Sequence, residues 1–281
     1  MVGITNKTLI AEIRRQQQLS QSIVEGQTAI STGITLTKPS DNALAWVQVS
    51  EIGKAQAQQS AWAANVSYGT ARAANAEANL EQITTLLVRA QELVTSARNG
   101  SLNTSGRAAI VEEMKTIRTT IDSLLNQQDY QGVPVFDDTQ SVLVPLSRGL
   151  NLAVVGTRQE VSEGIDVNGT PMSLDGILAQ SITALESGTD ADLVTSLGAI
   201  KMGQTHIVVE QAKQGVRGDR LDVIGERLKT VDLDLGERRE GLESTNLAEV
   251  ISSVKSKLLQ LEAAQSAFAR INQQTLFDLI R

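Results

Sequence analysis

The sequence contains no cysteine and only one histidine, His206. These absences exclude disulfide bridges, thiolate metal sites and the paired-histidine motif of zinc proteases. Aromatic residues make up only 2% of the 281 residues. Aromatic side chains normally fill the thick core of a globular domain, so their scarcity predicts burial in thin layers between helices. We expect no metal and no other cofactor.

Proline is also scarce, and its four positions are Pro39, Pro134, Pro145 and Pro171. No proline interrupts residues 40–133 or residues 172–281. Helix interiors exclude proline because its ring clashes with the preceding turn and it lacks an N–H donor. The composition therefore predicts a mainly helical and elongated protein.

Charge and hydropathy limit the possible partners. The chain has a net charge of −7 and no basic patch, which argues against a nucleic-acid partner. No apolar run reaches the roughly 18 residues that a membrane-spanning helix needs. The polar first residues lack the apolar core of a cleaved signal peptide. We expect no membrane insertion, and export from the cell would need another route.

Residues 52–97 carry the clearest periodic pattern. Small and apolar residues, with one glutamine, recur there at alternating spacings of three and four, which is typical of a coiled-coil helix. They are Ile52, Ala55, Gln59, Trp62, Val66, Gly69, Ala73, Ala76, Leu80, Ile83, Leu87, Ala90, Val94 and Ala97. At about 1.5 Å per residue, this helix is roughly 70 Å long. We expect it to stop at residues 98–101, where Gly100 suits a left-handed helix end.

Other segments repeat this spacing, and one interrupts it. Helical patterns follow Ser105 and occupy residues 174–187, 193–235 and 247–281, with a weaker pattern near the N-terminus. Residues 133–172 instead hold three of the four prolines and short runs of Val and Leu. Asn168-Gly169 predicts a tight hairpin turn. We therefore expect a small β-rich insert in the middle of the chain.

The order of these segments is roughly symmetric about the insert. We predict an N-terminal assembly arm (1–45), core helices (46–132), the β-rich insert (133–172), further core helices (173–240) and a C-terminal assembly arm (241–281). Residues 1–45 and 246–281 each carry four basic and three acidic residues, so the middle of the chain is acidic. Short amphipathic ends are marginally stable alone, which favours contacts between subunits there.

No group of residues indicates an enzyme. His206 has no second histidine or cysteine to assist it, and we interpret it as a helix-surface residue. Glu112-Glu113 and Asp137-Asp138 could be paired carboxylates for acid–base catalysis. Adjacent residues on a helix do not face each other, and the second pair begins a loop. We therefore expect both pairs to lie on the solvated surface.

Several motifs resemble those of bacterial flagellins and their relatives. Ile30-Ser31-Thr32-Gly33, followed by residues 37–43 (Thr-Lys-Pro-Ser-Asp-Asn-Ala), is similar to the family's N-terminal signature. Residues 90–101, the segment Gln131–Phe136 and residues 261–279 also resemble the family. This resemblance implies terminal arms that fold into a coiled coil on assembly. It also implies export through the flagellar apparatus, with an export chaperone.

Within the family, two types of subunit remain open. The ending Thr275-Leu276-Phe277-Asp278-Leu279 is more similar to the hook-associated members that join hook to filament. Phe136-Asp137-Asp138 departs from the pattern of those members and keeps a filament flagellin as the alternative. A cytoplasmic signalling coiled coil is a third hypothesis, but it requires an uninterrupted helical hairpin where this chain has an insert.

The two terminal patterns give the predicted assembly interface. Its residues are Leu9, Ile13, Ile23, Ile30, Ile251, Val254, Leu258, Leu261, Phe268, Leu276 and Phe277. The resemblance implies that they contact flagellin, hook-associated proteins and like subunits in a ring or filament, outside the cell.

Overall fold

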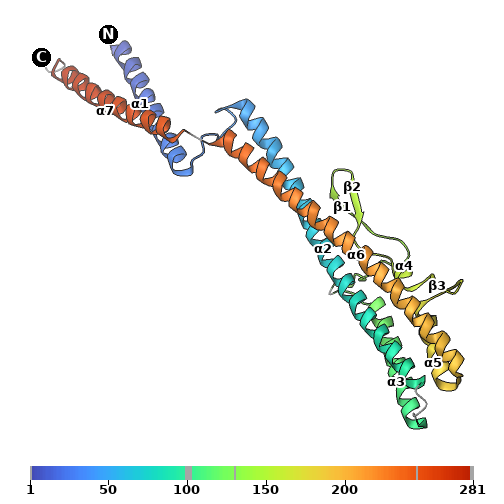
Figure 1. Ribbon diagram of the computed structural model, residues 1–281. Coiled ribbons are helices and arrows are strands. Elements are labelled where there is room, and N and C mark those ends of the chain that lie inside the picture. The colour runs from blue at the N-terminus through green and yellow to red at the C-terminus, as the bar shows by residue number, and fades with distance from the viewer. Residues whose placement is uncertain (1, 99–102, 130, 245, 279–281) are drawn as a thin grey trace. The chain divides into compact units, whose positions relative to one another are not determined.

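The computed structural model describes residues 2–98, 103–129, 131–244 and 246–278, with side chains described from residue 10 to residue 270 within these ranges. Most of this chain is helical, and two pairs of short strands lie in its middle (Figure 1). The helices are α1 (Val2–Thr32), α2 (Ala43–Arg98), α3 (Thr104–Leu125), α4 (Arg158–Ser162), α5 (Leu174–Ser187), α6 (Asp190–Glu243) and α7 (Leu247–Asp278). The strands are β1 (Leu143–Ser147), β2 (Leu150–Ala153), β3 (Ile165–Val167) and β4 (Thr170–Met172). The expectation of a mainly helical chain with a small β insert is confirmed.

The chain divides into two units. The terminal unit lies within residues 1–57 and 232–281, and the central unit comprises residues 58–231. The long helices α2 and α6 each contribute to both units.

The core of the central unit follows the predicted stripe along α2. Every stripe residue within residues 66–97 is buried, whereas those within residues 52–62 are half-buried. Small residues let the helices approach closely, since a Cβ added at Gly69 would lie 3.3 Å from the Leu221 side chain of α6. Phe136 is the one aromatic residue among the buried residues of the described chain. The buried apolar residues of the central unit are therefore almost all aliphatic.

Helix α2 begins nine residues before the predicted stripe. The side-chain oxygen of Asn42 accepts a hydrogen bond from the backbone N–H of Ala45 at 3.1 Å, which satisfies a free donor at the helix start. Ala45 and Val49 continue the stripe backward from Ile52 at the same spacing, and Ala45 is buried. The pattern could therefore have been extended to the true start of the helix.

The insert contains two antiparallel hairpins and a short helix. The predicted turn at Asn168-Gly169 joins β3 to β4, and the two residues have φ values of 54° and 88°. Both values lie in the left-handed region that Asn and Gly tolerate in hairpin turns. Helix α4 departs from the expectation of strands. It begins with a capping box, in which Thr157 and Glu160 each accept a hydrogen bond from the other's backbone N–H.

Candidate assembly interface

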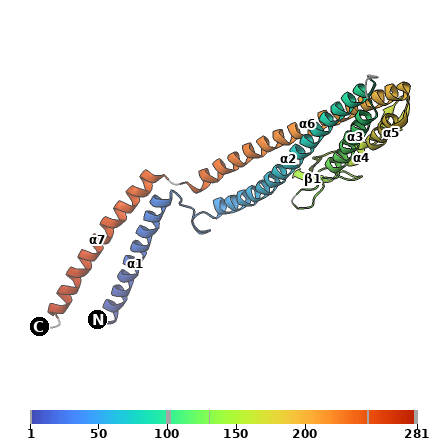
Figure 2. The same ribbon diagram turned by 90° about the horizontal axis from the view of Figure 1, so that it is seen from below.

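Helices α1 and α7 lie side by side in the terminal unit, as both views show (Figures 1 and 2). The buried apolar residues of these two helices include Ile23, Ala29 and Val254. Gly26 marks a close approach, because an added Cβ there would overlap the side chain of Val254. The two ends of the chain therefore meet at a position where a larger residue would not fit.

Residues 33–42, between α1 and α2, form a turn around Asp41, which we call the corner. The Asp41 carboxylate accepts hydrogen bonds from the backbone N–H groups of Thr37 and Lys38 at 3.0 and 2.9 Å, and from the Thr37 hydroxyl at 3.1 Å. Aspartate suits such a turn because its short side chain reaches nearby backbone donors. The backbone N–H of Thr35 also donates to the carbonyl of Glu243 at 3.0 Å. Asp41 of the signature thus holds the turn, and Thr35 joins this segment to the end of α6.

An exposed ion pair links this corner to α1. The Nζ of Lys38 lies 2.9 Å from the Oε1 of Glu25. The hydrogen bond and the charge of Lys38 hold the pKa of Glu25 below its ordinary value, and Glu25 raises the pKa of Lys38. Lost hydration acts to raise the pKa of Asp41, but hydrogen bonds from Lys38 and Thr37 outweigh it and the pKa is lowered. All three groups therefore carry their charges at neutral pH.

A groove of about 400 Å³ lies between α1, the corner and the start of α7. Its lining combines apolar residues such as Ala29, Ile34 and Val254 with charged residues of both signs. The charged residues are Glu25, Lys38, Asp41 and Lys257. The groove is thus bordered by both ends of the chain.

The structure separates the predicted interface residues into groups. The exposed residues are Ile13, Ile251 and Leu258, at 41%, 39% and 39% of their surface. Ile30, Leu261 and Phe268 are half-buried, and Ile23 and Val254 are buried within the terminal unit. The side chains of Leu9, Leu276 and Phe277 lie outside the described residues. Helices α1 and α7 therefore bring the two patterns together and leave part of each uncovered.

Sequence reasoning missed other exposed apolar residues of the terminal unit. Val24 is 57% exposed and Leu259 is 67% exposed, more than any described residue of the predicted interface. Each follows a stripe residue directly, so a search limited to spacings of three and four passes over it. A count of all apolar residues on the two terminal helices could have found them.

Asp137 corrects the expectation of a solvated carboxylate pair. It is only 3% exposed, and its carboxylate accepts hydrogen bonds from Arg72 at 2.9 Å and from the N–H of Val142 at 2.7 Å. Arg72 is itself buried on α2. The neighbouring Asp138 is exposed and pairs with Arg158 at 2.8 Å. The expectation is right for Asp138 and wrong for Asp137, because the insert folds back over α2 and covers it.

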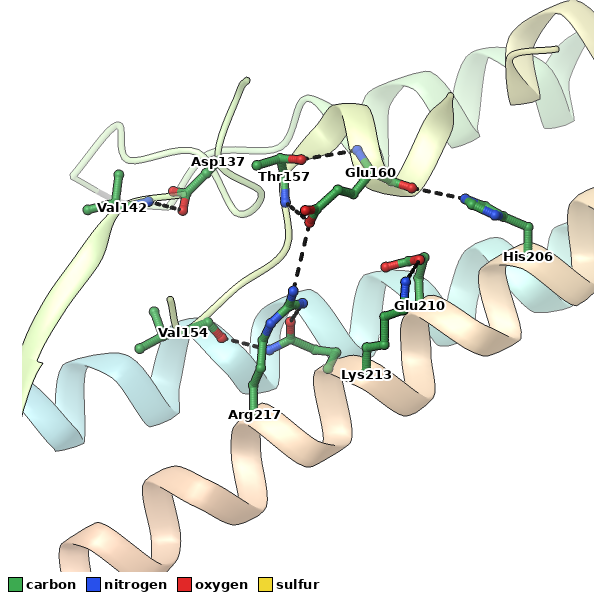
Figure 3. A network of polar contacts seen from close by, with 10 residues as sticks. Asp137, Val142, Val154, Thr157, Glu160, His206, Glu210, Lys213 and Arg217 are labelled. Carbon is green, nitrogen blue, oxygen red and sulfur yellow. Dashed lines mark hydrogen bonds and ion pairs between the residues drawn. The ribbon is translucent and has the colours of Figure 1, made fainter. Parts of the chain in front are cut away.

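Helix α6 also contacts the insert, through several polar side chains (Figure 3). The side-chain amide of Gln214 donates to the carbonyl of Val154 at 2.9 Å. The Nε2 of His206 lies 2.9 Å from the carbonyl oxygen of Glu160, and Arg217 lies 3.8 Å from the Glu160 carboxylate. His206 is half-buried at the helix surface and bonded to backbone, which agrees with its expected structural role. The insert therefore has a fixed position against both long helices.

The remaining candidate for acid–base chemistry lies at the surface. Glu112 and Glu113 form ion pairs with Lys115 and Arg89 at 3.2 and 2.7 Å. In the described part of the chain, no group of three or more His, Cys, Asp or Glu side chains could hold a metal ion. A search of the described helices finds none long and apolar enough to cross a membrane.

Comparison with known proteins adds to this picture. The profile of the bacterial flagellin N-terminal helical region matches residues 5–141. Flagellar hook-associated protein 3 of Salmonella typhimurium is 24% identical over 290 aligned residues, which cover 90% of this chain and 91% of that protein. Flagellin FljM of Caulobacter vibrioides is also 24% identical, over 85% of this chain and 88% of that protein.

A solved structure shares the fold. The structure assigned to a flagellar hook-associated protein of Vibrio parahaemolyticus has a TM-score of 0.66 and 19% identity, and the match covers 73% of this chain and all of that one. Fold, motifs and near-full-length sequence similarity agree. This chain belongs to the bacterial flagellin superfamily.

Proposed function

We propose that this chain is a structural subunit of the bacterial flagellum that joins the hook to the filament. The observation that carries the proposal is the similarity to flagellar hook-associated protein 3, which spans about nine tenths of both chains. A structural role also agrees with the central unit, whose buried polar groups hold helices and insert together.

The terminal unit supplies the contacts between subunits in this proposal. Ile13, Ile251 and Leu258 expose about two fifths of their surface, and Val24 and Leu259 expose more. Apolar side chains gathered on paired helices favour burial against a partner. We infer that the arms complete their folding on assembly, when hook-associated subunits, flagellin and like subunits cover these residues.

A filament flagellin is the second candidate. The similarity to flagellin FljM supports this candidate, because FljM and hook-associated protein 3 are each 24% identical to this chain. The two candidates differ in self-assembly, since a filament subunit must add to copies of itself without limit.

The route to the flagellum belongs to the same proposal. We infer that the chain is secreted through the flagellar export apparatus and that an export chaperone protects the arms beforehand. Support comes from the family alone. A strain without a functional export apparatus should retain the chain in the cell, and unchanged release into the medium would contradict this route.

Gene deletion and electron microscopy test the function. In the source bacterium, we expect deletion to leave hooks without filaments, and flagellin to accumulate in the medium. The purified chain should add to hook ends but form no long filaments on filament seeds under salting-out conditions. Long homopolymers would instead make it a filament flagellin, and normal filaments in the deletion strain would contradict the junction role.

A matched pair of variants tests the terminal interface. Leu258 in α7 and Val88 in the central unit have nearly equal exposure, 39% and 40%. We expect Leu258→Asp to abolish incorporation into flagella and Val88→Asp to leave it normal. Circular dichroism should show the same helix content for both monomers. Normal incorporation of the Leu258 variant would remove this residue from the interface.

A further inference from the structure

The outer side of α6 in the central unit carries a second stripe that the core does not use. Val209, Val216 and Val223 recur at every seventh residue and are 47%, 66% and 69% exposed. Ala212 lies between the first two and Asp219 between the last two, and both are exposed. The five residues have the alternating spacing of a coiled-coil seam, with one charged position. Single exposed valines are common on protein surfaces, but a row at heptad spacing indicates a contact face.

The outer side of α2 carries a matching stripe of exposed residues. It consists of Ala64, Tyr68, Ala71, Asn75 and Ala78, again at alternating spacings of four and three. Residues 58–76 are all described, and none of them exposes a charge, because Arg72 is buried. Helices that face water normally carry charged residues on their solvent side. A charge-free face with an exposed tyrosine is typical of the centre of an interface.

The two stripes occupy the same length of the bundle. Gly69 of α2 lies against Leu221 of α6, and Gly225 of α6 lies against Val66 of α2. Residue numbers rise along one helix as they fall along the other, so the helices run antiparallel. The stretch from Val209 to Val223 therefore lies level with the alanine stripe of α2.

The stripes also face away from each other. Ala71 lies two residues from the buried Ala73, and Val216 lies two residues from the buried Gln214, whose side chain approaches the Ala73 carbonyl. Two residues correspond to about 200° around a helix. Each stripe therefore lies on the side of its helix opposite the α2–α6 contact.

We propose that the valine stripe of α6 in one copy packs on the alanine stripe of α2 in the next copy. Valines at every seventh residue can pack against alanines at every seventh residue, because the small side chains let the helices approach. Two different surfaces on opposite sides meet, so the contact continues from copy to copy as a ring or row instead of closing a dimer. The proposal rests on the proposed function, which places several copies side by side.

The contact between the two stripes is too small to hold two copies together without further contacts from the terminal arms. Each stripe is about 21 Å long and a helix is about 10 Å wide, so the contact covers on the order of 200 Å² per copy. Stable pairs of proteins bury about 800 Å² per partner. Dilute chains should therefore remain monomeric, and the stripes should meet only inside an assembled structure.

Cross-linking tests the contact in intact flagella. The natural chain has no cysteine, so the introduced thiols are the only ones in this chain. We expect the double variant Ala71→Cys, Val216→Cys to form a ladder of linked oligomers with a short bis-maleimide. Each single variant and the control Val88→Cys, Val216→Cys should remain monomeric. Equal ladders from the control, or no ladder from double-variant chains incorporated into flagella, would overturn the proposal.

A charge variant makes the test independent of cysteines. Val216→Asp should lower the number of incorporated chains at least tenfold, whereas Val88→Asp should be incorporated normally. Normal incorporation of Val216→Asp would overturn the side-by-side contact alone. Failure of the natural chain to join flagella would instead overturn the proposed function and, with it, this contact.

Discussion

The two units carry the same kind of stripe with different results. Among the described residues, the buried apolar residues outside the central unit are only Ile23, Ala29, Leu36, Ala45 and Val254. In the central unit, α2 is covered by α6 and the insert, and α3 packs on α5. In the terminal unit, α1 and α7 pack mainly against each other. A stripe therefore shows that a helix has an apolar face, and the number of partner elements decides whether its own chain covers that face.

The difference is also one of energy. Complete burial of a leucine-sized side chain contributes about 1.5–3 kcal/mol to folding. Leu87 in the central unit is 0% exposed, whereas Leu258 in α7 is 39% exposed. The central unit thus buries its leucine side chains more completely than the terminal unit does within the single chain.

The largest effect is expected at a feature that the terminal unit does not share. Among the described ion pairs, Arg72–Asp137 is the one whose two side chains are both buried, at 7% and 3% exposure. Asp137→Ala leaves the Arg72 charge buried without its partner, which should lower the free energy of unfolding by about 3–5 kcal/mol. Urea unfolding followed by circular dichroism measures the change.

Asp138 is the matched control because it is the adjacent residue, with a side chain 71% exposed. Its replacement by alanine should cost no more than about 1 kcal/mol. Equal losses for the two variants would contradict the buried ion pair. The double replacement Arg72→Met, Asp137→Leu should recover most of the stability, since it leaves no unpaired charge.

A pair of leucine truncations tests whether the two units differ in how much stability a buried side chain contributes. Leu87→Ala creates a cavity in the core of the central unit and should cost about 2–5 kcal/mol. Leu258→Ala removes a side chain that water already reaches, and the monomer should change by less than about 0.5 kcal/mol. Urea unfolding of the purified monomers gives both free energies. If Leu258→Ala lost as much stability as Leu87→Ala, the conclusion that α7 leaves Leu258 partly uncovered in the monomer would be wrong.

Local periodicity is the part of the fold that the sequence predicts well. The stripe within residues 66–97 is buried throughout, and Asn168-Gly169 forms the expected turn. Both features depend on residues a few positions apart, whose spacing sets the helix face or the turn type. Helix α4 is only five residues long, so it gives no periodic pattern and was missed.

Long-range contacts explain what the sequence does not reveal. Asp137 is buried by Arg72, a residue 65 positions earlier, and no local pattern links the two. The terminal stripes are equally ambiguous, because Ile23 is buried and Ile13 is exposed although both have helical spacing. Whether a neighbour covers an apolar residue depends on where the other elements lie, which spacing alone does not encode.

A glycine substitution tests how closely α1 and α7 pack within the terminal unit. In Gly26→Ala, the added methyl overlaps the side chain of Val254 and should push α1 away from α7, at a cost of about 1–3 kcal/mol. Hydrogen exchange of the amides in α1 and α7 should become faster. Gly53→Ala is the control, since nothing lies within 4 Å of its added Cβ, and a helical alanine should stabilise by about 0.5–1 kcal/mol. Unchanged exchange in the Gly26 variant would contradict the close approach.

The smallest effect is expected at a partly exposed ion pair between α3 and α5. The Nε and Nη2 atoms of Arg118 donate to the two carboxylate oxygens of Asp175 at 2.5 and 2.8 Å, and the side chains are 40% and 60% exposed. Asp175→Asn should lower the free energy of unfolding at pH 7 by no more than about 1 kcal/mol, because solvent screens the pair. Urea unfolding at several pH values provides the measurement.

The sign of the pH dependence follows from the pKa of Asp175. The hydrogen bond from Arg118, followed by its charge, holds this pKa below the ordinary value of 3.8 despite partial loss of hydration. A carboxyl whose pKa is lowered by folding contributes its stability above the ordinary value and loses it as the pH falls through the folded pKa. The natural chain and Asp175→Asn should therefore differ at pH 7 and converge as the pH falls below 3.8. A difference that stays constant between pH 7 and pH 3 would assign the effect to lost packing rather than to charge.

The other partner of the ion pair gives a second check. Arg118→Gln should lower the free energy of unfolding by about as much as Asp175→Asn does. The double variant should be little less stable than either single variant, because each single variant already lacks the interaction.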